Sequence, residues 1–275
     1  MGVLHDPPGF HIESSSRKLW RYIQLPQLLR ILQEEQLHFS SPASFPDPFE
    51  GTLPKAWYEY QSERHRALEE SLGQDEGEIS ELSETRREIV RSNLFVNCWH
   101  GNNSESAAMW SRYFNREFTI AITSTANDLK ESLADQEEYS IAVGEIEYVN
   151  FDLGLDEISD ADLNSINRVH AEDDDELGLV LLKRKEFEYE SEVRAVVVDH
   201  VLRTTLLERD LEVAEDVEPP VDVKVDLGDL INEIRLGPAA DNWFVETVEN
   251  MVENSNTDLG KNDVIESDLD TDPIK

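Results

Sequence analysis

The chain has 275 residues, with 60 Asp and Glu against 24 Lys and Arg, one cysteine, and a formal net charge of −36. Such a charge excludes direct nucleic-acid binding through a basic patch, because the sequence contains no such patch. A single cysteine excludes an internal disulfide and a Cys-based zinc site. The sequence has neither a signal peptide nor an apolar run of roughly 18–20 residues. We therefore expect a cytoplasmic protein without membrane association.

The acidic residues recur in nearly every segment rather than in one tail. At low ionic strength so much like charge opposes compaction, and molar salt shortens the Debye length to roughly 3 Å and removes that penalty. We interpret the composition as adaptation to the salt-rich cytoplasm of a halophile. Acidic runs are therefore poor predictors of metal sites here, and no metal ligands are assigned.

Strands and helices do not alternate strictly along the chain. Short apolar or aromatic runs predict strands at 17–23, 37–39, 93–99, 118–122, 139–149, 192–200, 221–225 and 231–236. Apolar stripes at helical spacing predict helices at 25–32, within 56–92, and at 107–113, 125–133, 177–184 and 242–252. A doubly wound parallel sheet requires strict alternation. We therefore predict an α+β fold with a mixed, largely antiparallel sheet and flanking helices.

Composition divides the chain into three parts. Residues 1–16 are rich in Pro, Gly and Ser and predict a flexible N-terminus. Residues 17–253 are expected to form a single α+β domain, with a helical pair at 56–92 and an acidic segment at 150–178 as insertions. Residues 254–275 are polar, acidic and free of aromatic residues, which predicts a disordered tail.

Reactive and aromatic side chains gather in four stiff segments: 20–22, 47–50, 98–113 and 185–194. In the last of these, residues two apart on a strand share a face, so Glu188, Glu190 and Glu192 are expected on one side. Carboxylates this close repel unless they are solvated, paired with a cation or used in function. Arg194 and Arg21 are the candidate partners, and a polar edge strand with a ladder of ion pairs is the alternative.

In order, these segments resemble motifs of the uncharacterised family called domain of unknown function 2971, over about residues 17–252. The matching motifs are Trp20-Arg21-Tyr22, Asp47-Pro48-Phe49-Glu50, Cys98-Trp99 with Met109-Trp110-x-x-Tyr113, Tyr189-Glu190-x-Glu192-x-Arg194, and Leu236-Gly237-Pro238. Position 46 departs from the pattern, since it is Pro where the family has Asn before Asp-Pro. The family name carries no reaction.

A more distant resemblance suggests a chemistry. A strand with a basic residue, a helix, a second strand bearing Ser and a late Glu-x-Glu are similar to ADP-ribosyltransferases. This resemblance implies an ADP-ribosyltransferase-like fold with a split sheet that clamps NAD, and an unknown acceptor. It implies that Glu192 is the catalytic carboxylate, which stabilises the cationic ribose as nicotinamide leaves, and that Glu190 positions it.

The same resemblance implies a set of NAD-binding residues. Arg21 would hold phosphate or ribose, because its planar fork suits a pyrophosphate. Either Ser40 or Ser41 would shape the nicotinamide side. The ring-stacking candidates are Tyr22, Phe49, Trp110 and Tyr113, and the remaining assigned residues are Asp47, Glu50 and Arg194.

Two other functions remain open. A non-catalytic nucleotide-sensing or protein-interaction module would lock Glu190 and Glu192 in pairs with Arg194. A metal-dependent nuclease would gather Asp47, Glu50 and the two late glutamates around Mg²⁺. A transferase would instead bring Arg21, Ser40 or Ser41, and Glu192 to one cleft. The spacing of Cys98 and His100 argues against a nucleophile pair, and Trp110 and Tyr113 also fit a packed helix face.

The spread of negative charge predicts that salt stabilises the fold. Raising KCl from roughly 0.1 M to roughly 1 M shortens the Debye length from about 10 Å to about 3 Å. The thermal unfolding midpoint, followed by circular dichroism, should therefore rise across this range. Sucrose at equal osmolality is the control, because it favours burial without screening charge. A midpoint that does not change with KCl, or that rises equally in sucrose, would contradict screening as the cause.

Overall fold

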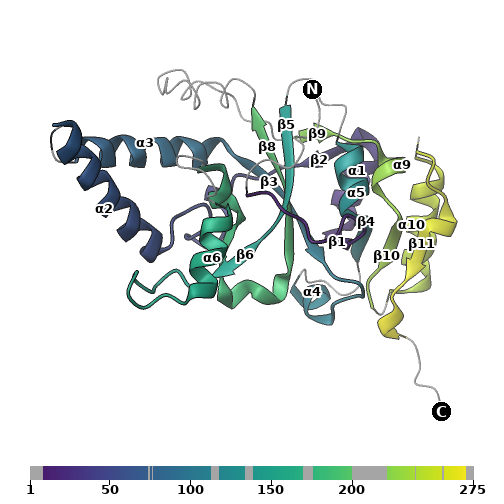
Figure 1. Cartoon of the computed structure of the whole chain (residues 1–275). Helices are drawn as coiled ribbons and strands as arrows, with labels where there is room; N and C mark the ends of the chain where they lie inside the picture. Colours follow the sequence, from purple (N-terminus) through teal and green to yellow (C-terminus); the bar gives the residue numbers. More distant parts are fainter. Residues whose placement is uncertain are drawn as a thin grey trace, which may run out of the picture.

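One mixed sheet organises the computed structural model, which describes residues 9–73, 75, 77–112, 118–133, 139–169, 176–199, 222–238, 240–255 and 257–270. Among these residues seven strands pair in the order β11-β10-β4-β1-β3-β8-β5 (Figure 1). They span Lys18–Gln24 (β1), Phe95–Gly101 (β3), Thr119–Thr125 (β4), Tyr139–Glu145 (β5), Glu192–Asp199 (β8), Glu233–Leu236 (β10) and Val264–Glu266 (β11). Neighbours are antiparallel except β10 and β11, which are parallel.

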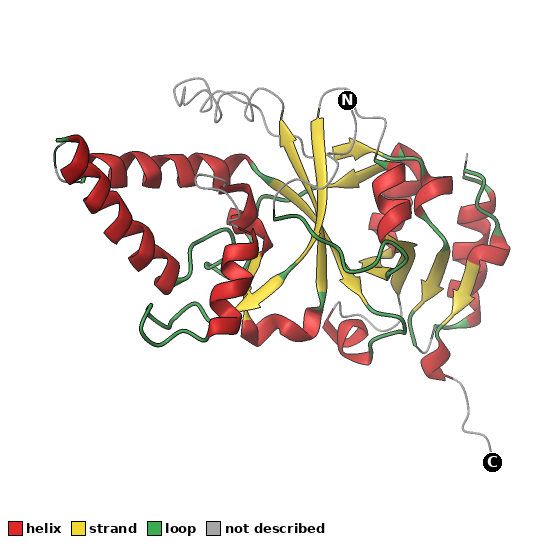
Figure 2. Cartoon of the chain, viewed as in Figure 1, coloured by secondary structure: helices red, strands yellow, loops and turns green. Residues whose placement is uncertain are grey.

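Helices lie on both sides of this sheet (Figure 2). The α-helices are Leu25–Glu34 (α1), Lys55–Leu72 (α2), Glu78–Asn93 (α3), Ala107–Arg112 (α4), Ala126–Ser132 (α5), Asp160–Val169 (α6), Leu227–Leu230 (α9) and Asn242–Glu253 (α10). The 3₁₀ helices are Pro42–Ser44 (η1), Glu176–Leu181 (η2), Lys185–Glu190 (η3), Lys261–Asp263 (η4) and Asp268–Asp270 (η5). The predicted α+β class with a mostly antiparallel mixed sheet is confirmed.

Two small sheets complete the fold. Strand β2 (Gln36–His38) pairs antiparallel with β9 (Asp222–Lys224), and β6 (Glu147–Val149) pairs parallel with β7 (Leu182–Arg184). Residues 177–184 are thus a 3₁₀ turn followed by a strand rather than the predicted helix. The predicted helical pair at 56–92 is present as α2 and α3, which project from the sheet at the left of Figure 1.

The alternation of side chains along the central strands creates two cores. On β8, Val193 and Val197 join the core that α1, α5, α9 and α10 cover, whereas Val196 points to the other face. On β5, Ile141 lies in the same core as Val193 and Val197, and Ala142 lies in the second core with Val196. A strand buried on both faces carries apolar residues without interruption, so a charged residue within it must have partners.

The sheet is split between β1 and β3. Strand β1 pairs with β4 at all seven of its positions, but among the described residues it pairs with β3 only at Leu19↔Gly101 and Trp20↔His100. Ser40 instead forms an isolated bridge with Val96 near the start of β3. Where the ladder stops, the Arg21 Nη1 donates to the Cys98 carbonyl at 3.5 Å. The parting of these strands opens a space between them.

The ordered domain extends beyond both predicted boundaries. Phe10 is buried in the second core, although 1–16 were expected to be flexible. At the other end β11 adds to the sheet, and the Asp268 carboxylate pairs with Arg235 at 2.9 Å. Residues 257–270, predicted as part of a disordered tail, thus include the strand β11, which pairs with β10, and the 3₁₀ helix η5; the last five residues lie outside the described chain.

The acidic segment at 150–178 also contributes to the core. Phe151, Ile166 and Val169 are buried in the second core, and the last two of them lie on α6. Residues 170–175 lie outside the described chain. A merely solvated segment does not describe this region, because one face of α6 is apolar and packs on the sheet.

Ending the chain at Asn254 should lower the free energy of unfolding by roughly 2 kcal/mol or more, at about 1 kcal/mol for each net hydrogen bond lost from the ladder and from Arg235. A chain ending at Asp270 keeps β11 and the Asp268 contact and is the control. Urea denaturation at constant KCl measures the difference. Equal midpoints for the two truncated chains would show that residues 255–270 add nothing to the fold.

Candidate functional site

A cavity of about 420 Å³ occupies the split between β1 and β3. Its wall includes four cationic side chains, from Arg21, Arg112, Lys183 and Arg184. It also includes four carboxylates, from Asp47, Glu50, Glu190 and Glu192. Aromatic rings supply much of the remaining surface, from Trp20, Tyr22, Phe45, Trp99, His100 and Phe187. The cavity therefore combines flat apolar walls with dense, balanced charge.

The Arg194 guanidinium lies directly behind this wall and is completely buried. Its Nε donates to Glu192 Oε1 at 2.7 Å, its Nη2 to Glu50 Oε2 at 2.8 Å, and its Nη1 to the Val180 carbonyl at 2.6 Å. A buried charge is tolerated only when it is paired and its hydrogen bonds are satisfied. Arg194 thereby ties β8 to the 47–50 loop and to η2.

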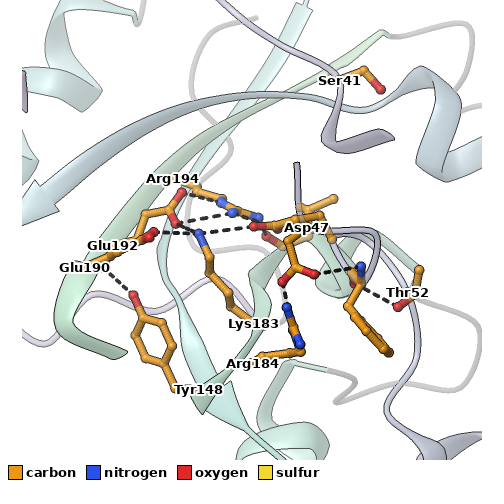
Figure 3. Close-up of polar contacts among 12 residues, drawn as sticks. Ser41, Asp47, Thr52, Tyr148, Lys183, Arg184, Glu190, Glu192 and Arg194 are labelled. Atoms are coloured by element: carbon orange, nitrogen blue, oxygen red, sulfur yellow. Dashed lines mark hydrogen bonds and ion pairs between the residues drawn. The ribbon is translucent and has the colours of Figure 1, made fainter. Parts of the chain in front are cut away.

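Lys183, at the centre of β7, contacts three carboxylates with one ammonium group. Its Nζ lies 3.1 Å from Glu50 Oε1, 2.7 Å from Glu190 Oε2 and 2.8 Å from Glu192 Oε2 (Figure 3). Arg112, from α4, pairs with the second oxygen of Glu190. Three carboxylates are thus matched by three cations, which we call the ion cluster: Glu50, Glu190, Glu192, Lys183, Arg194 and Arg112.

The backbone brings Glu190 to this cluster by a turn. Residues 185–190 form η3 rather than the predicted start of a strand, and Glu188 is exposed. Ser191 then adopts a left-handed conformation, with φ of 39°, before β8 begins at Glu192. The prediction that Glu188, Glu190 and Glu192 share one strand face was therefore wrong, although the last two do meet.

The cluster sets the protonation of its members. Burial alone would raise the pKa of Glu192, but the charges of Arg194 and Lys183 and the hydrogen bonds outweigh burial and lower this pKa to about 2. Burial and the Glu192 charge raise the pKa of the Cys98 thiol. Cys98 is thus a neutral thiol at pH 7, which agrees with the rejection of a Cys98–His100 nucleophile pair.

The structure brings most of the predicted site residues to the cavity. Those that line it are Arg21, Tyr22, Ser40, Asp47, Glu50, Glu190 and Glu192, and Arg194 supports them from behind. Tyr22 also accepts a hydrogen bond from the Ser106 backbone at 3.2 Å. Tyr113 lies outside the described residues. Distant segments of the chain therefore do converge on one hollow.

Three predicted residues lie away from the cavity. The Ser41 hydroxyl accepts from the Ala43 backbone at 3.3 Å as the cap of η1, and it stands apart from the ion cluster in Figure 3. Phe49 packs edge-on against Phe151, with ring centroids 5.7 Å apart. Trp110 is buried, and its ring centroid lies 4.8 Å from that of Tyr22. Ser41 and Phe49 are half-buried and Trp110 is buried, and none of the three lines the cavity, so the packed-face interpretation holds for Trp110.

The geometry that a nuclease needs is not met. The Asp47 carboxylate forms an ion pair with Arg184 at 3.0 Å and accepts a hydrogen bond from the Phe49 backbone N–H at 3.2 Å. These contacts hold the 47–50 loop in place and occupy the oxygens that a metal ion would need. The ammonium group of Lys183 already lies among the three glutamates, where a metal ion would need to sit. No group of three or more metal-ligating side chains occurs in the described part of the chain.

Sequence reasoning missed three members of the site. Lys183 follows the buried run 179–182, and a lysine directly after four apolar residues is a signal of a buried cation. Arg112 lay in a predicted helix without an assigned role. His100 was considered only as a partner of Cys98, yet it lines the cavity.

Comparison with known proteins matches part of the chain to a family of unknown function. The family model described as protein of unknown function (DUF2971) matches residues 109–195, a stretch that contains Arg112, Lys183, Glu190, Glu192 and Arg194. This match supports the family suggested by the sequence motifs. No curated protein and no solved structure matches the chain. In the described residues, no helix is long and apolar enough to cross a membrane.

Replacing Glu192 with Gln should lower the free energy of unfolding at pH 7 by about 3–5 kcal/mol, because one partner leaves a buried cluster. Glu192 has a folded pKa of about 2, below its ordinary 4.5. Its stabilisation is therefore fully present above pH 4.5 and is lost as the pH falls toward 2.

Urea denaturation of the wild type and of Glu192→Gln at several pH values measures this effect. The difference in the free energy of unfolding between the wild type and Glu192→Gln should shrink as the pH falls from 4.5 toward 2. Glu188→Gln, an exposed neighbour on η3, is the matched control. A difference that is constant from pH 7 to pH 3 would contradict a buried, ionised Glu192.

Proposed function

We propose that this protein binds a nucleotide in the cavity between β1 and β3, and that Glu190 and Glu192 act there as structural anions. One observation carries the proposal: a single cavity in a strongly acidic chain is lined by four cations and several aromatic rings. The cations suit the phosphate groups of a nucleotide, and the aromatic rings suit its base or a nicotinamide ring.

Charge supports an anionic ligand at this place. The four lining cations together with Arg194 carry five positive charges against four carboxylates, which leaves a local excess of one. The chain as a whole carries −36. An anionic ligand therefore meets far less electrostatic repulsion in the cavity than the net charge of the whole chain would suggest.

The rings support a flat ligand group. The Arg21 guanidinium lies 5.9 Å from the centroid of the Trp99 ring, and the Lys183 ammonium lies 5.2 Å from that of Phe187. Cations next to aromatic faces place phosphate-binding and ring-stacking groups side by side. A volume of about 420 Å³ falls within the range for small-molecule sites.

The ion cluster favours binding over catalysis. Both Glu192 oxygens accept hydrogen bonds, Oε1 from Arg194 and Oε2 from Lys183, and both Glu190 oxygens are paired with Lys183 and Arg112. A carboxylate whose charge is already compensated offers little stabilisation to a developing oxocarbenium ion. A non-catalytic nucleotide-sensing module is expected to pair both glutamates with Arg194; Glu192 does so, whereas Glu190 pairs with Lys183 and Arg112 instead.

An NAD-dependent, ADP-ribosyltransferase-like enzyme acting on an unknown acceptor is the second candidate. Arg21, Ser40 and Glu192 all line the same cavity, which is the convergence that such an enzyme needs. In that case Glu192 would face the ribose carbon as nicotinamide leaves. The two candidates share the binding step and differ in turnover.

Calorimetric titration in molar KCl should detect binding of NAD, ADP-ribose or ATP to the wild type. Arg21→Gln should weaken that affinity roughly tenfold or more, because it removes a charged hydrogen-bond donor from the cavity wall. Arg30→Gln is the control, since Arg30 is exposed and pairs with Glu34 on α1. Absence of binding by all three ligands, or an unchanged affinity in Arg21→Gln, would contradict the proposal.

The same samples separate the two candidates. The nucleotide-binding proposal expects NAD to bind without release of nicotinamide. Release that disappears in a folded Glu192→Gln protein, with binding retained, would instead establish that Glu192 supports cleavage of NAD, with water or an acceptor taking the ADP-ribosyl group.

A further inference from the structure

His100 is held in one tautomer by the backbone. It lies on β3, and its Nδ1 is hydrogen-bonded to the Glu190 carbonyl oxygen. A carbonyl oxygen only accepts, so Nδ1 must carry the proton and donate it. In the neutral ring Nε2 is then left with a lone pair and acts as an acceptor. Burial lowers the pKa of His100, so the ring stays neutral at pH 7.

This acceptor is buried and unsatisfied. His100 is 4% exposed and lines the cavity, and within the described chain its Nε2 has no hydrogen-bond partner. Leaving a buried acceptor without a donor destabilises the folded protein. Such a group inside a cavity is explained if a bound ligand supplies the missing donor.

The position of His100 in the fold sets where that donor would lie. Trp20↔His100 is the last pair before β1 and β3 part, so the side chain stands where the split begins. Glu192 is its neighbour across on β8, and the Tyr22 ring centroid lies 6.2 Å away. His100 thus stands beside both the ion cluster and the aromatic wall.

We propose that His100 Nε2 accepts a hydrogen bond from a hydroxyl or amino group of the bound nucleotide and so determines which ligands the cavity accepts. The inference rests on the proposed nucleotide binding. Two parts of a nucleotide offer such a donor: a ribose hydroxyl and the exocyclic amine of the base. A site built around a buried acceptor discriminates against ligands that lack the matching donor.

Ligand analogues and two variants test this inference together. The ligands are ATP, 2′-deoxy-ATP, 3′-deoxy-ATP and inosine triphosphate, with NAD and nicotinamide hypoxanthine dinucleotide as a second series. His100→Asn keeps a donor near the Nδ1 position but removes Nε2, whereas His100→Gln restores an acceptor near Nε2. Calorimetry in molar KCl measures each affinity.

The wild type should bind one analogue roughly fivefold more weakly than its parent, as expected for one lost hydrogen bond. His100→Asn should bind parent and analogue equally, and His100→Gln should recover part of the preference. Weaker binding of a deoxy analogue identifies a ribose hydroxyl as the donor to His100. Weaker binding of the inosine or hypoxanthine analogue identifies the exocyclic amine as that donor. Discrimination that persists in His100→Asn, or a wild type that binds all analogues equally, overturns the role of His100 while nucleotide binding stands.

A measurement on the protein without ligand tests the role of His100 separately from nucleotide binding. Nitrogen-15 chemical shifts of the His100 ring in the free protein should report a proton on Nδ1 and a lone pair on Nε2. A proton on Nε2 overturns the inference whatever binds. If neither nucleotide series binds the wild type, nucleotide binding and the inference that rests on it are both overturned.

Discussion

The buried guanidinium of Arg194 imposes the constraint on which the site depends. It lies near the start of β8, a strand packed on both faces, where an uncompensated charge would be very costly. Its compensation comes from Glu192 on the same strand, from Glu50 in a distant loop and from the Val180 carbonyl. Lys183 then neutralises the carboxylate charge that one arginine cannot balance. Charge balance thereby fixes the distant 47–50 loop against the stretch from Val180 to Arg194.

This cluster also explains how a cavity persists inside the sheet. Strands β1 and β3 part after Trp20, and the space between them is bounded on one side by side chains that are tied to one another by ion pairs. Rings of Trp99 and Phe187 supply the apolar part of the wall. A hollow bounded by paired charges and rigid rings cannot collapse as an apolar void can. The same pairing makes the cavity close to neutral in a chain that carries −36.

The Glu-x-Glu motif illustrates why an acidic pattern alone does not establish a reaction. Glu190 and Glu192 do meet at the cavity, as the resemblance to ADP-ribosyltransferases implies. Both are nevertheless held by cations of the ion cluster, and Glu192 is ionised with a pKa lowered to about 2. In the proposed nucleotide-binding function they act as structural anions. His100, with its fixed tautomer and open acceptor, lines the cavity and has hydrogen-bonding capacity left for a ligand.

Local patterns sufficed for the α+β class and for most strands and helices, because apolar periodicity reports which face of an element is buried, but they missed the strands β7 and β11. They also placed Arg21, Glu190 and Glu192 in one site, through ordered motifs rather than through spacing. Only the tertiary structure decided that Lys183 joins the carboxylates, that Ser41, Phe49 and Trp110 face away from the cavity, and that 257–270 add a strand to the sheet. The reason is physical: periodicity is a property of neighbouring residues, whereas the pairing of a buried charge depends on how the chain folds back, and it includes Glu50, which is more than a hundred residues from Lys183 and Arg194.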